Sequence, residues 1–161
     1  MPPDRDALRR RFQFRCGYCG VREGDVGAEL TVDHFRPRSR GGTDEPDNLV
    51  YCCHACNEFK GDFWELDPPR RLLHPLRDAP AAHLAEEPDG TLRGLTVTGA
   101  FHLDRLRLNR PPLVEYRRER RRLDAARRAE RQLLDRLREL DGRLERLLAD
   151  LDRLRPGDGA G

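Results

Sequence analysis

The feature that most constrains this chain is a set of four cysteines arranged as two C-x-x-C pairs, Cys16/Cys19 and Cys53/Cys56. In a reducing compartment thiols stay reduced, so clustered pairs indicate a metal site rather than disulfides. Four thiolates from two such turns match a closed tetrahedral structural zinc site. The alternative is that the pairs are buried reduced thiols or redox pairs. The fifth cysteine, Cys52, is expected to be a packed strand residue, unless it replaces Cys53 as a ligand.

Composition limits what surrounds these pairs. The chain has 161 residues and a formal charge of +2, and charged residues equal hydrophobic ones at 37% each. Such a composition favours a small core with an extended charged helix over one large core. Since no apolar run approaches the ~20 residues that a membrane span needs, we expect no membrane partner. The N-terminus lacks the apolar stretch of a secretory signal, so a cytoplasmic location is predicted.

Residue patterns predict short elements around the cysteine pairs. Alternation, turn formers and breakers predict a helix at 4–14, a strand at 30–35, a loop at 37–48, a strand at 48–52 and a helix at 57–65. Further along, the turn Pro88-Asp89-Gly90 predicts a hairpin between residues 83–87 and 91–97. Residues 100–108 fit a helix or a strand, and the two prolines at 111 and 112 predict a break.

The C-terminal part carries the clearest periodicity. Positions separated alternately by three and four residues predict a helix of about 60 Å over residues 113–154 with a leucine heptad repeat; they are Leu123, Ala126, Glu130, Leu133, Leu137, Leu140, Leu144, Leu147, Leu151 and Leu154. We favour a homodimer through residues 123–154, in which a parallel pair would place Arg136 opposite Asp141 and Asp150 opposite Arg155. The alternative is that the leucines fold back onto their own domain.

The segment between and after the cysteine pairs carries a longer motif. It reads C-x-x-C, then D-H-x-x-P-x-S-x-G-G, then N-L, then C-x-x-C-N-x-x-K, over residues 16–61. In this pattern the chain resembles the HNH endonucleases, specifically their zinc-stabilised branch. A segment ending in Leu108-Asn109-Arg110-Pro111 also resembles one that follows this module in many small bacterial HNH proteins, and we interpret it as a packing segment.

The resemblance implies a ββα-metal fold that presents a divalent cation to a scissile phosphate. It implies that His34 is the general base, because an imidazole has an ordinary pKa near ~6.5. Asp33 and Asn57 would supply hard oxygen ligands to Mg²⁺ or Mn²⁺. Asn48 would brace the loop that carries His34.

Four basic side chains near this motif are candidates for phosphate contacts: Arg36, Arg38, Arg40 and Lys60. Adjacent strand residues point to opposite faces. We therefore expect a distorted or bulged backbone that turns Asp33 and His34 toward one site.

Together these features predict an α+β chain. It would comprise a zinc-stabilised ββα-metal nuclease domain at 1–65, a connecting α/β region at 66–112, a long helix at 113–155 and a disordered tail at 156–161. The predicted function is metal-dependent hydrolysis of DNA phosphodiester bonds. The alternative is a non-catalytic zinc-knuckle DNA-binding or adaptor protein that dimerises through its C-terminal helix.

Overall fold

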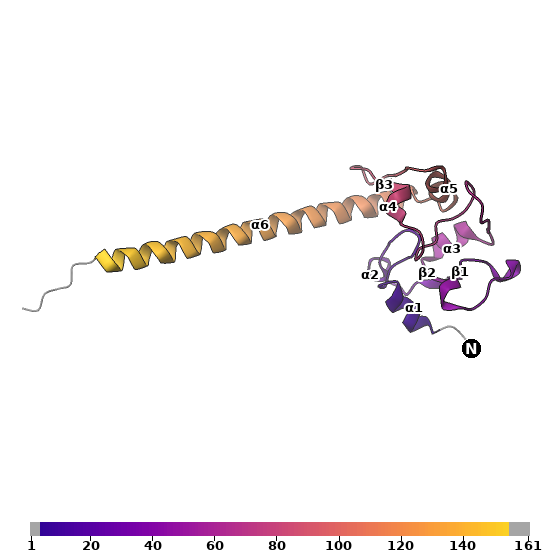
Figure 1. Ribbon diagram of the computed structural model, residues 1–161, viewed down its shortest axis with the longest axis horizontal. Helices are drawn as coiled ribbons and strands as arrows, with labels where there is room; N and C mark the ends of the chain where they lie inside the picture. The colour runs from indigo at the N-terminus through magenta and orange to yellow at the C-terminus, as the bar shows by residue number, and fades with distance from the viewer. Residues whose placement is uncertain (1–3, 155–161) are drawn as a thin grey trace, which may run out of the picture. The chain divides into compact units, whose positions relative to one another are not determined.

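The computed structural model describes residues 4–154. The chain forms two compact units, one up to Arg118 and one from Glu119 onward. Figure 1 shows the elements, which are α1 (Arg5–Arg11), α2 (Glu23–Val26), β1 (Thr31–His34), η1 (Arg38–Arg40), η2 (Pro46–Asn48), β2 (Leu49–Cys52), α3 (His54–Lys60), α4 (Pro80–His83), β3 (Leu84–Glu86), β4 (Leu92–Gly94), α5 (Val97–Arg105) and α6 (Pro111–Leu154). The predicted mixed α+β class is confirmed.

The β1–β2 hairpin lies at the centre of the first unit. The two strands pair antiparallel, with Asp33 opposite Val50 and His34 opposite Leu49. All four β2 residues are buried, since α1 packs on β2 and α3 packs on β1. The pairing is regular through residues 31–34, so the expected bulge at Asp33 and His34 is wrong. Their side chains therefore point to opposite faces of the hairpin.

Helix α3 begins three residues earlier than predicted and ends five residues earlier. Its N-cap is Cys53, so the second cysteine pair occupies the first turn of the helix. The helix stops after Lys60 because Gly61 takes a positive φ of 56°, a conformation that glycine adopts readily. The sequence pattern missed this start because Cys53 makes no side-chain capping hydrogen bond, and cysteine is not among the residues that usually mark a helix N-terminus.

The region after residue 65 adds to the same core. Leu72, Leu106, Leu108 and Leu113 belong to one buried cluster with residues of α1 and β2. The predicted β-hairpin is present as β3 and β4, with shorter strands. The ambiguous segment at 100–108 contains most of a helix, α5, whose N-cap Thr96 accepts a hydrogen bond from Gly99 N.

The break predicted at the two prolines is instead the start of α6. Proline is favoured at the first turn of a helix, where its missing N–H would have no helical partner. From residue 119 onward the helix forms the second unit, and its large leucines are 45–79% exposed. In the described residues no helix is both long enough and apolar enough to cross a membrane. Arg155 and the predicted tail at 156–161 lie outside the described residues.

Candidate active site and thiolate cluster

Four cysteine sulfurs come together where the turn after α1 meets the first turn of α3. The Sγ atoms of Cys16, Cys19, Cys53 and Cys56 all lie within 4.8 Å of one another. Tetrahedral Zn–S bonds of ~2.3 Å place two sulfurs ~3.8 Å apart, and the Sγ atoms of Cys19 and Cys53 are 3.8 Å apart. The donors and their spacing thus fit a zinc-type site, and the predicted clustering is confirmed.

Cys52 is not part of this cluster. It is fully buried on β2, and burial raises the pKa of its thiol. A thiol of this kind packs as a small apolar side chain. The structure thus favours the prediction that Cys52 is a packed strand residue over its alternative as a ligand.

His34 lies at the end of β1, with 21% of its side chain exposed. Its Nε2 is 2.7 Å from Asp44 Oδ1. A carboxylate only accepts hydrogen bonds, so this contact places the imidazole hydrogen on Nε2. The same carboxylate oxygen accepts a hydrogen bond of 2.6 Å from Arg38. Although Arg38 Nε also lies 3.2 Å from Nε2, a protonated Nε2 cannot accept from it, and Asp44 holds both groups.

Asp44 is the site residue that the sequence did not reveal. It belongs to a turn-rich loop whose acidic residues look alike in sequence, and only the closure of this loop brings one of them to His34. Hydrogen bonds from His34 and Arg38 lower the pKa of the Asp44 carboxyl, so it is an anion at neutral pH.

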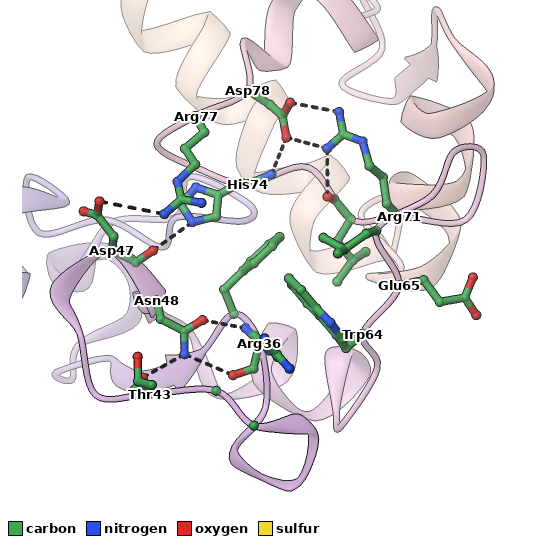
Figure 2. A pocket seen from close by; sticks show the side chains of 15 residues that line it. Arg36, Thr43, Asp47, Asn48, Trp64, Glu65, Arg71, His74, Arg77 and Asp78 are labelled. Carbon is green, nitrogen blue, oxygen red and sulfur yellow. Dashed lines mark hydrogen bonds and ion pairs between the residues drawn. The ribbon is translucent and has the colours of Figure 1, made fainter.

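Asn48 closes the base of this loop. Its Oδ1 accepts from Arg36 N at 2.8 Å, and its Nδ2 donates to the carbonyl oxygens of Arg36 and Thr43. Figure 2 shows these bonds as dashed lines. The chain approaches itself so closely here that a Cβ on Gly42 would collide with the Arg36 carbonyl oxygen. The contacts have the bracing geometry predicted for Asn48.

Asp33 points into the core, away from the face that carries His34. Its Oδ2 accepts a hydrogen bond of 2.7 Å from the Tyr18 hydroxyl. The Lys60 ammonium donates to Asp33 Oδ1 at 3.1 Å and to the His34 carbonyl oxygen at 2.7 Å. Burial raises the pKa of the Asp33 carboxyl, and the Lys60 charge opposes that shift.

This arrangement corrects the predicted role of Lys60. Its side chain is fully buried, so it does not contact phosphate and instead serves as the internal counter-ion of Asp33. Asn57 lies on α3 with intermediate exposure, and its side-chain amide has no hydrogen-bonding partner among the described residues. Both carboxylate oxygens of Asp33 accept hydrogen bonds, whereas the Asn57 amide oxygen has no such contact among the described residues.

The three loop arginines are exposed. Arg36 donates to the Arg40 carbonyl oxygen at 2.6 Å, and its guanidinium lies 5.8 Å from the centre of the Trp64 ring. Arg38 is held by Asp44. The exposed positions of Arg36, Arg38 and Arg40 on one loop are compatible with contacts to a nucleic-acid backbone.

A pocket of about 490 Å³ lies beside the loop and is shown in Figure 2. Phe35 and Trp64, which meet edge to face, line it together with polar residues of the 71–78 segment. The charges on that segment are paired, because Arg71 forms two short hydrogen bonds to Asp78. The sequence did not predict this pocket, because its walls come from segments about 30 residues apart.

Comparisons with known proteins agree with this site. Residues 16–63 match the family described as HNH endonuclease. The chain is similar to the Septu protein PtuA of Bacillus mycoides, with 27% identity over 140 residues covering 68% of this chain and 20% of the relative. It is also similar to the CRISPR-associated endonuclease Cas9 of Corynebacterium diphtheriae, with 39% identity over 54 residues covering 33% of this chain and 5% of the relative.

The chain therefore spans a fifth or less of the length of these two relatives. No solved structure matches the chain.

Proposed function

Because residues 16–63 form an HNH endonuclease domain, we propose that this protein is a metal-dependent endonuclease that hydrolyses DNA phosphodiester bonds. The observation that carries the proposal is the short contact between His34 and Asp44 on the exposed side of the β1–β2 hairpin. It supplies an oriented imidazole next to a loop of exposed arginines. The similarity of a 54-residue stretch of this chain to a protein named as an endonuclease supports the same activity.

His34 acts as the general base through Nδ1. With the hydrogen on Nε2 bound to Asp44, the lone pair of the ring remains on Nδ1. Among the described residues Nδ1 has no hydrogen-bonding partner, so it is open to a water molecule. As that water attacks phosphorus, Nδ1 takes its proton and the P–O bond to the 3′ oxygen breaks. General-base catalysis of this kind contributes about 10²–10⁴-fold.

Arg36, Arg38 and Arg40 position the substrate backbone in this proposal. A guanidinium binds phosphate oxygens through paired hydrogen bonds. Arg38 is the best placed of the three, because Asp44 holds it beside His34. A phosphate bound there would lie next to the water that His34 activates.

Asp33 and Asn57 are the proposed ligands of Mg²⁺ or Mn²⁺, which would polarise the phosphate and stabilise the leaving oxygen. Their oxygen donors suit such hard cations. The contacts of Asp33 do not fit a role as a cation ligand, because Tyr18 and Lys60 donate hydrogen bonds to its two carboxylate oxygens. A cation at Asp33 would have to displace the Lys60 ammonium, so no step above depends on the ion.

The occupied Asp33 also favours a second candidate function. A carboxylate neutralised by a buried lysine is a structural group, and a module with such a group could bind DNA without cutting it. In that case the protein is a zinc-knuckle DNA-binding or adaptor protein. The same arginine loop would serve it, whereas the His34–Asp44 contact would have no use.

Plasmid cleavage separates the two functions. The full chain is incubated with supercoiled plasmid and Mg²⁺ or Mn²⁺, beside the variants His34→Ala and His54→Ala. His54 is the matched control, because its side chain is 82% exposed and, among the described residues, makes one ion-pair contact, to Glu58. Cleavage by the wild type and His54→Ala, lost in His34→Ala and without metal, supports the nuclease. Plasmid binding without cleavage in all three samples favours the adaptor.

We further propose that the four cysteines hold structural zinc, and that α6 pairs with α6 of a second copy through its leucine heptads. The thiolate spacing supports the zinc, and the exposure of the heptad leucines supports the pairing. We also propose a cytoplasmic location, because cysteine pairs that hold zinc as thiolates are typical of a reducing compartment.

A further inference from the structure

The segment Leu108-Asn109-Arg110-Pro111, interpreted above as packing, has a distinct contact at each position. Leu108 is 1% exposed in the core. Asn109 accepts from Leu92 N and donates to Leu92 O, which fixes the β3–β4 hairpin. Pro111 begins α6. The remaining residue, Arg110, reaches the thiolate cluster.

The Arg110 guanidinium donates hydrogen bonds to two of the four clustered sulfurs. Its Nη2 lies 3.5 Å from Cys56 Sγ and 3.7 Å from Cys53 Sγ. Both sulfurs belong to the pair at the start of α3. Distances of this size are usual for hydrogen bonds to sulfur, whose radius exceeds that of oxygen.

Three further contacts orient this guanidinium. Its Nη1 donates to the carbonyl oxygens of Leu106 and Arg107. Its carbon lies 5.4 Å from the centre of the Phe59 ring on α3, in a cation–π contact. A long side chain held along its length has little freedom left to lose when it binds the sulfurs, so the hydrogen bonds to sulfur are preorganised.

We propose that Arg110 is the counter-ion of the thiolate zinc site and strengthens its hold on the metal. This inference rests on the zinc site proposed above. Zn²⁺ with four thiolates carries a net charge of −2, and Cys16, Cys53 and Cys56 are buried. A cation that hydrogen-bonds two of the sulfurs offsets part of that charge, because buried sulfurs are not solvated by water. Partners of metal ligands typically contribute 10–100-fold to affinity.

The same contact links the metal site to the rest of the unit. Arg110 immediately precedes α6, and Asn109 beside it binds Leu92 of the hairpin, so the 108–111 segment joins the hairpin and α6 to the cysteine cluster. A packing residue at position 110 would need only the right shape. A counter-ion needs its charge and the Nη2 donor that faces both sulfurs, and this difference makes the proposal testable.

The test measures zinc affinity of the full chain by competition with a chromogenic chelator. The variants are Arg110→Gln and the matched control Arg107→Gln. Arg107 also lies over Phe59, at 4.8 Å, and loses the same charge, but it donates to neither sulfur. We expect Arg110→Gln to bind zinc at least about 10-fold more weakly than the wild type, and Arg107→Gln to bind as the wild type does.

Cobalt(II) provides a second readout that needs no activity. Thiolate-bound Co²⁺ absorbs through sulfur-to-metal charge transfer, and loss of the Arg110 hydrogen bonds is expected to shift this band in Arg110→Gln but not in Arg107→Gln. Equal zinc affinity and identical cobalt spectra in Arg110→Gln and the wild type would overturn the proposal. Wild-type protein that binds no zinc would instead overturn the zinc site itself.

A variant that fails to fold does not end the test. Arg110→Lys keeps the charge but lacks the second nitrogen with which Arg110 donates to the Leu106 and Arg107 carbonyl oxygens, so its donor is no longer oriented toward the sulfurs. Its zinc is expected to exchange to the chelator faster than that of Arg107→Lys. Equal exchange rates in the two lysine variants would overturn the role of the paired hydrogen bonds.

Discussion

The imidazole of His34 and the carboxylate of Asp44 lie 2.7 Å apart, although they are ten positions apart in the chain. Asn48 makes this contact possible, because its amide joins the two ends of the intervening loop at Arg36 and Thr43. The relationship fixes which imidazole nitrogen carries the hydrogen. It also explains why one carboxylate of an acidic loop matters more to the proposed chemistry than its neighbours.

Replacing Asp44 tests this relationship. We expect Asp44→Ala to lower kcat for plasmid cleavage about 10–100-fold, because the base loses its orientation and Arg38 loses the carboxylate that holds it beside His34. Glu45→Ala is the matched control, since Glu45 is the next carboxylate in the same exposed loop. Side-chain ¹⁵N NMR should show His34 protonated on Nε2 in the wild type and mixed tautomers in Asp44→Ala. An unchanged tautomer with lost activity would contradict the positioning role.

Zinc removal should unfold the module around the cysteine pairs. Structural thiolate sites contribute about 10–16 kcal/mol of apparent binding free energy in zinc-finger peptides. Strong chelation, or Cys16→Ser, is therefore expected to abolish much of the circular dichroism signal of the first unit. Cys52→Ser is the control, because Cys52 lies outside the cluster and should only lower stability modestly. A folded, metal-free Cys16→Ser variant would speak against a structural metal.

Stability should fall with acidification because of His102. Burial lowers the pKa of His102 to about 4, and its Nδ1 accepts a hydrogen bond from Leu73 N at 3.0 Å. The unfolded chain binds this proton near pH ~6.5, so the folded state is fully stable above that pH and loses stability as the pH falls toward 4. The loss should reach about 2–3 kcal/mol.

Urea unfolding at several pH values measures this effect. His102→Gln keeps an acceptor but cannot bind the proton, so its free energy of unfolding should vary less between pH 6.5 and 4. The control is His54→Gln, which removes an exposed imidazole that contacts Glu58 on α3. A wild-type protein with constant stability across this range would show that His102 is not buried as a neutral group.

The exposed leucines of α6 should drive self-association. We expect the wild type to sediment as a dimer at micromolar concentration and Leu140→Asp to sediment as a monomer, because burial of each leucine contributes about 1.5–3 kcal/mol. Leu140 is 53% exposed in the single chain. Arg138→Asp places the same charge on the same helix away from the stripe and should leave the dimer intact. A monomeric wild type would exclude the paired helix.

Several features of the site could be predicted from residue spacing because they depend on local geometry. The two thiols of a C-x-x-C pair lie close together in many structural settings. The clustering of the pairs Cys16/Cys19 and Cys53/Cys56 could therefore be predicted from the sequence. The bracing role of Asn48 was implied by the resemblance to the HNH endonucleases and not by spacing. The roles of Asp44 and Lys60 were missed, since loop closure and burial are properties of the packed chain.

The sequence by itself determined the cysteine cluster, the short strands around it and the long heptad helix, since each is encoded in spacing along a few turns of chain. Only the tertiary structure decided that Asp33 turns inward to a buried Lys60, that Asp44 meets His34, and that Arg110 reaches the sulfurs of Cys53 and Cys56. The physical reason is that the pairing of a charged side chain depends on which polar groups lie next to it once the core has packed. A local sequence pattern does not specify those neighbours.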